Sequence, residues 1–291
     1  MAPIVKQLES CRETCDTIVC VTAQHRQMLD QVLNLFDINP QYDLDVMKEN
    51  QTLPDLTANV LSGVTRVMEQ EKPDMVFVQG DTTTTFATSL AAFYLKIPVA
   101  HVEAGLRTRN KFSPFPEEIN RRLTTMIADY HFAPTEEAKN NLINDGIAES
   151  SIFVTGNTVI DALKIVVEKH DKMSEQIRWH DFFLSNFKIH LSDSKRTILV
   201  TGHRRESFGE GFERICHALR TLALNNPDIQ IIYPVHLNPN VKKPVYSILS
   251  DIENINLIPP LDYEPFVFLM NKSYLILTDS GGVQEEAPTL G

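Results

Sequence analysis

Short apolar, β-branched runs alternate with longer amphipathic stretches along nearly the whole 291-residue chain. This alternation is typical of repeated strand and helix units, which build parallel sheets covered by helices. Most runs are followed by a polar or glycine-containing turn and then by a helical pattern. The predicted strands lie at residues 17–22, 75–79, 97–103, 130–134, 151–155, 196–201, 229–235, 255–259 and 273–278. We therefore predict an α/β fold.

The alternation is interrupted once, between residues 165 and 195, where the chain is polar and charged. We place a domain junction there, and predict two doubly wound Rossmann-like domains that face a cleft, at residues 1–170 and 171–291. Four aromatic residues of the interrupted stretch are interpreted as packing residues: Trp179, Phe182, Phe183 and Phe187. Ligands of doubly wound sheets bind outside the carboxyl ends of the strands. Functional residues are therefore expected directly after each strand.

The composition limits the partners and the compartment. A net charge of −11 excludes a broad surface for nucleic acid or anionic membrane, although a small anion can bind in a local cationic pocket. The four cysteines lack the paired spacing of zinc or thioredoxin-like sites, which predicts reduced thiols and no metal. No apolar stretch approaches a membrane span of about 20 residues, and the N-terminus lacks a signal peptide pattern. We expect a cytoplasmic protein without membrane insertion.

Acidic residues follow two predicted strands of the first half, and another begins a helix. Asp81 either caps the next helix or belongs to a site. Glu103 directly follows apolar strand residues, where a charge is costly unless it is paired or solvated in a cleft, and Arg107 is a possible partner. Glu117 either complements a helix dipole or supplies a third carboxylate. His101 lies inside the strand and is interpreted as a hydrogen-bonded core histidine.

Basic residues follow strands in the second half. His203 and Arg204 come directly after a strand, where they form either a cationic mouth for phosphate or a salt-bridged surface turn. His236 follows the next strand. The glycines at 209 and 211 lack the third glycine and the strand-adjacent position of a dinucleotide fingerprint, so no NAD site or other cofactor is predicted.

The last predicted strand runs into a serine and two glycines. At Ser280, Gly281 and Gly282, backbone N–H groups at a helix start are suited to the phosphates of a nucleotide diphosphate. Glu286, one turn later, is either a ribose ligand or an exposed helix acid. Carboxylates in one half and a cationic, phosphate-binding second half suit proton transfer or leaving-group departure on a nucleotide-linked substrate.

Eight segments, in order from end to end, resemble the bacterial non-hydrolysing UDP-N-acetylglucosamine 2-epimerases. They read VTAQHRQMLDQVL, GDTTTTFATSLAAF, HVEAGLRT, SPFPEEINRRLT, TGNTVIDAL, TGHRRESFGEGFE, YPVHLNPNV and LTDSGGVQEEAPTLG. The resemblance implies GT-B architecture, a homodimer, and interconversion of UDP-GlcNAc and UDP-ManNAc for surface polysaccharide synthesis. It also implies a route by anti elimination of UDP, a 2-acetamidoglucal intermediate and re-addition of UDP, with no cofactor.

The resemblance assigns roles to residues that match the family's motifs. The implied acid, base and pyrophosphate-side residues are Asp81, Glu103, Glu117 and His203. The substrate-binding candidates are Arg204, His236, Phe266, Ser280, Gly281, Gly282 and Glu286. The hypothesis for part of a second, activating UDP-GlcNAc site is Gln24, His25 and Arg26. Which carboxylate serves which face of the sugar stays open.

The same resemblance indicates that the chain is truncated at both ends. A first strand with its turn, and a closing strand, loop and helix, are expected to be missing, so we expect poor stability and weak activity. Three alternatives remain: a hydrolysing 2-epimerase that releases ManNAc and UDP, a GT-B glycosyltransferase, and a catalytically incomplete fragment that binds nucleotide sugars.

Overall fold

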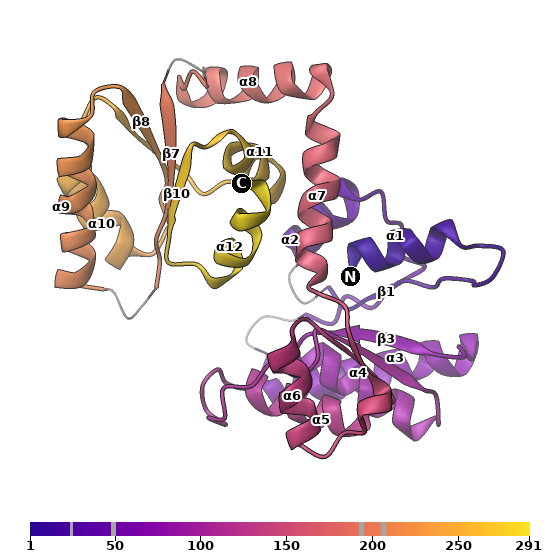
Figure 1. Cartoon of the computed structure of the whole chain (residues 1–291). Coiled ribbons are helices and arrows are strands. Elements are labelled where there is room, and N and C mark those ends of the chain that lie inside the picture. Colours follow the sequence, from indigo (N-terminus) through magenta and orange to yellow (C-terminus); the bar gives the residue numbers. More distant parts are fainter. Residues whose placement is uncertain (24–25, 48–50, 192–194, 205–207) are drawn as a thin grey trace. The chain divides into compact units, whose positions relative to one another are not determined.

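The chain divides into two compact units in the computed structural model (Figure 1). They are Met1–Thr158, called unit 1, and Val159–Gly291, called unit 2. The structure describes residues 1–23, 26–47, 51–191, 195–204 and 208–291, without the side chain of residue 27. The predicted domain junction, after residue 170, lies further along the chain than the observed division after Thr158. The difference arises because helix α7 (Thr158–His170) packs its last residue in unit 2, with ring centroids of His170 and Trp179 5.8 Å apart.

Unit 1 contains a four-stranded parallel sheet in the order β3-β4-β5-β6 and a separate parallel pair, β1-β2. Its strands are β1 (Cys20–Val21), β2 (Tyr42–Asp43), β3 (Val76–Gln79), β4 (Val99–Val102), β5 (Tyr130–Ala133) and β6 (Ile152–Val154). Its helices are α1 (Ala2–Ser10), α2 (Arg26–Leu35), α3 (Leu53–Glu71), α4 (Thr83–Tyr94), α5 (Glu117–Ile127), α6 (Glu136–Asn144) and the short η1 (Glu149–Ser151).

Unit 2 contains a four-stranded parallel sheet in the order β10-β7-β8-β9. Its strands are β7 (Arg196–Thr201), β8 (Ile229–Pro234), β9 (Ile255–Ile258) and β10 (Leu275–Thr278). After α7 its helices are α8 (Met173–Phe187), α9 (Glu210–Asn225), α10 (Pro239–Leu249), α11 (Tyr263–Lys272), α12 (Gly281–Glu286) and η3 (Ala287–Leu290). The chain runs from β7 outward to β9 and then returns to place β10 on the other side of β7.

Each predicted strand segment contains an observed strand, and the α/β class with parallel, Rossmann-like sheets is confirmed. Strand β2 was missed, because its two residues are too few to show an alternation. None of the helices in the described ranges combines the length and the apolar character that a membrane crossing requires.

Small apolar residues let the helices of unit 1 approach the sheet closely. Ala87 and Ala91 of α4 are fully buried and belong to one core cluster with Val60 and Val64 of α3 and Val99 of β4. Strand β4 is buried along its whole length, as expected of a central strand in a parallel sheet. Residues that follow β4 are therefore positioned by a fully packed element.

Unit 2 adds an aromatic cluster to its sheet core. The rings of Trp179 and Phe183 in α8 lie 6.2 Å and 6.3 Å, centroid to centroid, from Phe268 in α11. Phe182 and Phe187 make further edge-on contacts within α8, so the interpretation of these residues as packing residues is confirmed.

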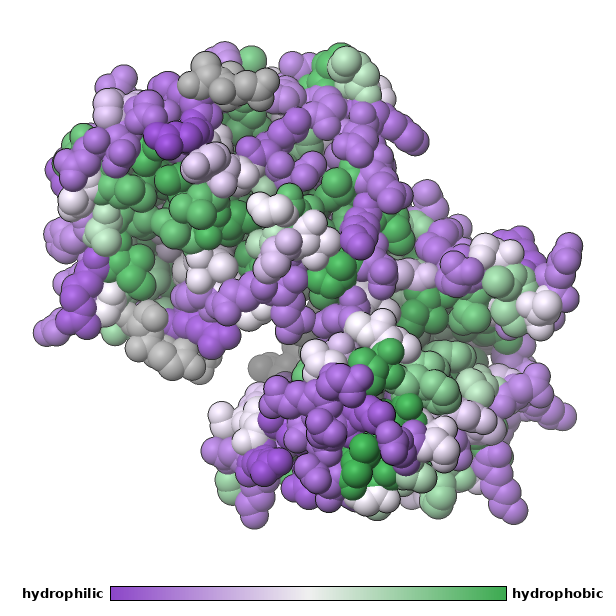
Figure 2. All heavy atoms as spheres, in the orientation of Figure 1, coloured by the Kyte–Doolittle hydropathy of each residue, from purple (hydrophilic) through white to green (hydrophobic). Residues whose placement is uncertain are grey.

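On the face shown in Figure 2, hydrophilic residues lie at the edges of both units, and hydrophobic residues gather between these edges, most visibly in a band on unit 2.

Gly105, three residues beyond the end of β4, is predicted to tolerate no side chain. Its φ is +95°, and an added Cβ would lie 2.3 Å from the carbonyl oxygen of Ala138 in α6. Gly146 provides a matched control, since its φ is +89° but nothing lies within 4 Å of an added Cβ. We expect Gly105→Ala to lower the free energy of unfolding by about 3 kcal/mol and Gly146→Ala by about 1 kcal/mol.

Urea unfolding followed by far-ultraviolet circular dichroism measures both variants. Trp179 is the only tryptophan and lies in unit 2, so its fluorescence separates the unfolding of unit 2 from that of unit 1. Equal losses for the two variants would show that backbone strain alone matters and that the contact with Ala138 does not.

Candidate functional site

The register of the sheet brings the ends of β3 and β4 together. Gln79 pairs with Val102, so the next residue of the first strand, Gly80, lies level with Glu103. Both residues turn the chain with left-handed backbone, φ being +73° for Gly80 and +63° for Glu103. Such a conformation costs a non-glycine residue about 1 kcal/mol or more and is concentrated at functional sites.

The Glu103 carboxylate lies over the end of β3. Its Oε2 accepts a hydrogen bond of 3.2 Å from the Gln79 side-chain amide, and an added Cβ on Gly80 would be 3.9 Å from the same oxygen. Arg107, considered as its partner, pairs with Asp145 at 2.9 Å and donates to the Thr125 hydroxyl. Gln79 is therefore the hydrogen-bond donor to Glu103, and the sequence did not identify it.

Asp81 is not the cap of α4. The hydroxyl of Thr82 accepts the Thr85 backbone N–H at 3.2 Å and fills that role. The Asp81 carboxylate instead accepts two hydrogen bonds at Oδ2 from Arg121 of α5, one from Nε at 3.1 Å and one from Nη2. Its backbone carbonyl accepts a further bond from the Asn120 amide at 3.0 Å. The Asp81 carboxylate is therefore oriented by α5 and does not cap α4.

Helix α5 begins with two adjacent acids of different surroundings. Glu117 is partly exposed, whereas Glu118 is buried. Glu118 accepts backbone N–H bonds from Thr108 at 3.0 Å and Arg109 at 3.1 Å, and lies 3.2 Å from Nη1 of Arg121. Sequence reasoning missed Glu118 and Arg121, although their spacing of three residues on one helix face was a usable signal.

His101 is the hydrogen-bonded core histidine that the sequence predicts. It is fully buried, and its Nε2 lies 2.8 Å from the Gly80 carbonyl oxygen. Burial lowers the pKa of His101 to about 4. The ring is therefore neutral at neutral pH and donates this hydrogen bond, which fixes the turn that precedes Asp81.

In unit 2 the candidate residues gather where the strand order reverses. Strand β7 leads to β8 on one side and pairs with β10 on the other, and ligands of open α/β sheets bind outside the strand ends at such a point. The hydroxyls of Thr201 and Thr278, the last residues of β7 and β10, lie 2.6 Å apart. His203 follows the first of these strands and Ser280 the second.

Asp279, between β10 and Ser280, ties the two turns together. Its carboxylate accepts the backbone N–H groups of His203 and Arg204, each at 2.9 Å, and lies 3.5 Å from His203 Nδ1. Sequence reasoning missed this residue, because its acceptor role depends on a turn far away in the chain. The contact holds the His203 ring at the end of the sheet.

Two further predicted residues lie beside this turn. The rings of His203 and His236 stack with centroids 5.6 Å apart and planes inclined by 19°. A Cβ added to Gly281 would lie 3.3 Å from Nη2 of Arg204, so the guanidinium lies against the glycine backbone. The cationic and glycine-rich segments predicted from the sequence are therefore adjacent in unit 2.

Glu286, at the end of α12, is not an exposed helix acid. It is buried, and its Oε1 accepts a hydrogen bond of 3.3 Å from the Tyr263 hydroxyl. Burial raises the pKa of Glu286. Phe266 lies on α11, partly buried, in the helix that also carries Tyr263.

The remaining predictions concern an activating site and metal binding. Gln24 and His25 lie outside the described residues, and Arg26 pairs with Asp30 at 3.1 Å and with Asp43. Across the described ranges, no group of three or more histidine, cysteine, aspartate or glutamate residues is arranged to hold a metal ion.

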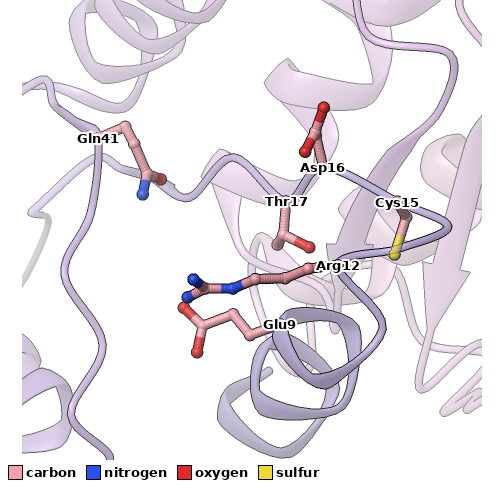
Figure 3. Close-up of a pocket in the computed structure, with 6 residues that line it drawn as sticks. All are labelled: Glu9, Arg12, Cys15, Asp16, Thr17 and Gln41. Carbon is pink, nitrogen blue, oxygen red and sulfur yellow. The ribbon is translucent and has the colours of Figure 1, made fainter.

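A cavity of about 320 Å³ in unit 1 lies apart from the candidate residues. Figure 3 shows five of its lining residues at the end of α1 and in the segment that follows, and Gln41 on a separate segment just before β2. The lining residues are Glu9, Arg12, Cys15, Asp16, Thr17 and Gln41. None of them was a predicted site residue.

Comparison with known proteins gives a consistent result. The family model described as UDP-N-acetylglucosamine 2-epimerase matches residues 8–291. A probable UDP-N-acetylglucosamine 2-epimerase of Ralstonia nicotianae is 57% identical over 291 residues, 100% of this chain and 76% of the relative. The Campylobacter jejuni enzyme is 57% identical over 293 residues with the same coverage. The Neisseria meningitidis epimerase, solved bound to UDP-GlcNAc, is 52% identical, with a TM-score of 0.86 and coverage of 100% and 76%.

The burial of His101 predicts a loss of stability in acid. Because its folded pKa of about 4 lies below the unfolded value of about 6.5, its contribution is fully present above pH 6.5 and disappears as the pH falls toward 4. Between pH 7.5 and pH 4.5, the wild type should lose about 2 to 3 kcal/mol more free energy of unfolding than His101→Gln.

Urea unfolding at the two pH values, followed by circular dichroism, measures this difference. His217→Gln, which replaces an exposed histidine on α9, is the control for the substitution itself. Identical pH dependence in the wild type and His101→Gln would contradict the prediction.

Proposed function

The chain belongs to the UDP-N-acetylglucosamine 2-epimerase family, and we propose that it interconverts UDP-GlcNAc and UDP-ManNAc. The observation that carries the proposal is the match of residues 8–291 to the family model. A 52% identical relative whose structure was solved with UDP-GlcNAc supports the substrate. Two acidic residues after neighbouring strands of unit 1 supply groups suited to proton transfer.

The chemistry follows from the position of the hydrogen that must be moved. The hydrogen on C2 of the sugar has no adjacent carbonyl to stabilise a carbanion. We propose that a carboxylate removes it while the C1–O bond to UDP breaks, which forms a C1–C2 double bond and gives 2-acetamidoglucal and UDP. UDP then adds back at C1 as a carboxylic acid delivers a proton to the opposite face of C2. Asp81, Glu103 and Glu117 are the proposed acid and base groups.

Unit 2 is proposed to bind the departing UDP. Positive charge and hydrogen-bond donors stabilise a diphosphate leaving group most strongly as its charge develops. His203 and Arg204 are the proposed donors, with His236, Ser280, Gly281 and Gly282 beside them. The proximity of the Arg204 guanidinium to Gly281 supports this grouping. Glu286 is proposed to accept ribose hydroxyls and Phe266 to contact the uracil.

Several features expected from the composition or from the family resemblance stay predictions. These are the homodimer, the cytoplasmic location, the role in surface polysaccharide synthesis and activation through Gln24, His25 and Arg26. Of these three residues, Arg26 forms ion pairs with Asp30 and Asp43.

We predict that UDP-GlcNAc incubated with the protein in deuterated water gives UDP-ManNAc that carries deuterium at C2. Proton NMR of the anomeric region and of H2 measures both products. Free ManNAc and UDP would indicate a hydrolysing enzyme, and sugar transfer that requires an added acceptor would indicate a glycosyltransferase. Binding of UDP without exchange at C2 would indicate a catalytically incomplete chain.

Removal of each proposed acid or base should lower kcat by about 10²-fold or more, since general acid–base catalysis contributes 10²- to 10⁴-fold. The variants are Asp81→Asn, Glu103→Gln and Glu117→Gln. Glu69→Gln, on the exposed face of α3, is the control and should retain wild-type kcat. A carboxylate whose removal leaves both epimerisation and C2 exchange at the wild-type rate has no part in proton transfer.

The buried Glu286 predicts a second effect, on UDP affinity. Loss of its charge in Glu286→Gln should weaken UDP binding about tenfold, because a charged acceptor for ribose hydroxyls becomes neutral. Isothermal titration calorimetry with UDP measures this change. Glu285→Gln, exposed on the same helix, is the matched control, and equal affinity for both variants would exclude Glu286 as a ribose ligand.

A further inference from the structure

We propose that Glu118 and Arg121 are positioning residues for the epimerisation, and that this buried pair gives the Asp81 carboxylate its working orientation. The inference rests on the proposed function and adds two residues to it. Neither residue is proposed to touch the substrate. Both lie on α5, three residues apart on one face, with 1% and 9% of their surface exposed.

Arg121 constrains one oxygen of the Asp81 carboxylate and leaves the other available. Both of its bonds, from Nε and from Nη2, reach Oδ2. Among the described residues no hydrogen bond to Oδ1 accompanies them. A carboxylate held through one oxygen presents the second, with its lone pairs, in a fixed direction. This is the arrangement that a proton-transfer group needs, because small misplacements are costly in rate.

Asp81 is also fixed at its backbone. The Asn120 amide, on the same helix, donates to the Asp81 carbonyl oxygen at 3.0 Å. The neutral His101 ring fixes the preceding carbonyl, that of Gly80. With the main chain held on both sides, the remaining freedom of Asp81 is rotation of its side chain. Arg121 removes that freedom.

Glu118 in turn holds Arg121 and the loop that follows Glu103. Its Oε2 accepts from Arg121 Nη1 and from the Thr108 N–H, and its Oε1 accepts from the Arg109 N–H. A buried carboxylate with three donors is well compensated for its lost hydration. One side chain thus links the helix that carries Glu117, the loop after Glu103 and, through Arg121, Asp81.

A positioning role differs from a structural role in its kinetic signature. Glu118→Gln keeps the shape of the side chain but replaces one acceptor oxygen with an amide donor, which cannot accept from Arg121 or a backbone N–H. Arg121→Lys keeps the charge but loses the second donor to Oδ2. We expect each change to lower kcat by about 10- to 100-fold while KM for UDP-GlcNAc stays within about threefold.

The decisive comparison uses a double variant. If Arg121 acts through Asp81, Arg121→Lys should cost less than about twofold in kcat when it is added to Asp81→Asn. In the wild-type background the same change should cost at least about tenfold. Equal effects in both backgrounds would overturn the proposal, since they would show that Arg121 acts without Asp81.

Two control variants separate positioning from loss of folding. Val60→Ala removes fully buried volume from the core cluster on α3 and lowers the stability of unit 1. Glu149→Gln breaks the 2.7 Å ion pair between the exposed Glu149 and Lys139 in the same unit. Both should retain wild-type kcat at a temperature where circular dichroism shows the chain folded. If kcat falls as much for Val60→Ala as for Glu118→Gln, Glu118 has only a structural role.

A second measurement does not require turnover. Nuclear magnetic resonance on the intact chain gives the exchange rates of the Thr108 and Arg109 amide hydrogens and the couplings that report the Asp81 side-chain rotamer. Glu118→Gln should accelerate both amides at least about tenfold, and Arg121→Lys should convert a single Asp81 rotamer into an average. Unchanged exchange and an unchanged rotamer would overturn the inference. Absence of epimerisation in the wild type would overturn the proposed function alone.

Discussion

The fixed register of the parallel strands is the constraint on which the candidate sites depend. In a parallel sheet every strand ends at the same edge, so residues that follow different strands become neighbours without being near in the sequence. The pairing of Gln79 with Val102 places Gly80 level with Glu103. The pairing of Leu277 with Val200 places the hydroxyls of the two following threonines side by side. It also brings Asp279 to the backbone N–H of His203. Side chains on the helices, such as Arg121 and Asn120 of α5, then orient these polar groups.

The parts of the fold that the sequence predicted are those set by local pattern. The strand segments were visible because their apolar, β-branched runs are bounded by turns, and Asp81 and Glu103 were visible because charges directly after such runs are unusual. His101 was interpretable for the same reason, since a polar ring inside a buried strand needs a partner. Burial and turn position follow from a few neighbouring residues.

The parts that escaped prediction depend on partners distant in the chain. Arg121 contacts a carboxylate 40 positions away, and Asp279 accepts from backbone groups more than 70 positions away. From the sequence alone, Glu118 can be read as an acid that complements the helix dipole, and Arg107 as a cation near Glu103. Neither interpretation identifies the groups to which these side chains bind in the structure. The junction after α7 was misplaced along the chain for a related reason, because the helical pattern does not indicate which unit buries His170.

The two units use their buried volume differently, and the difference bears on function. Unit 2 fills the space between α8 and α11 with aromatic rings, whereas α5 of unit 1 buries Glu118, Asn120, Arg121, Thr124 and Thr125. Apolar side chains of similar volume commonly stabilise a fold as well as, or better than, a buried ion pair does. Stability alone therefore does not account for a charged face on α5. The proposed orientation of the Asp81 carboxylate does account for it, because a guanidinium fork fixes the direction of a carboxylate and an apolar contact cannot.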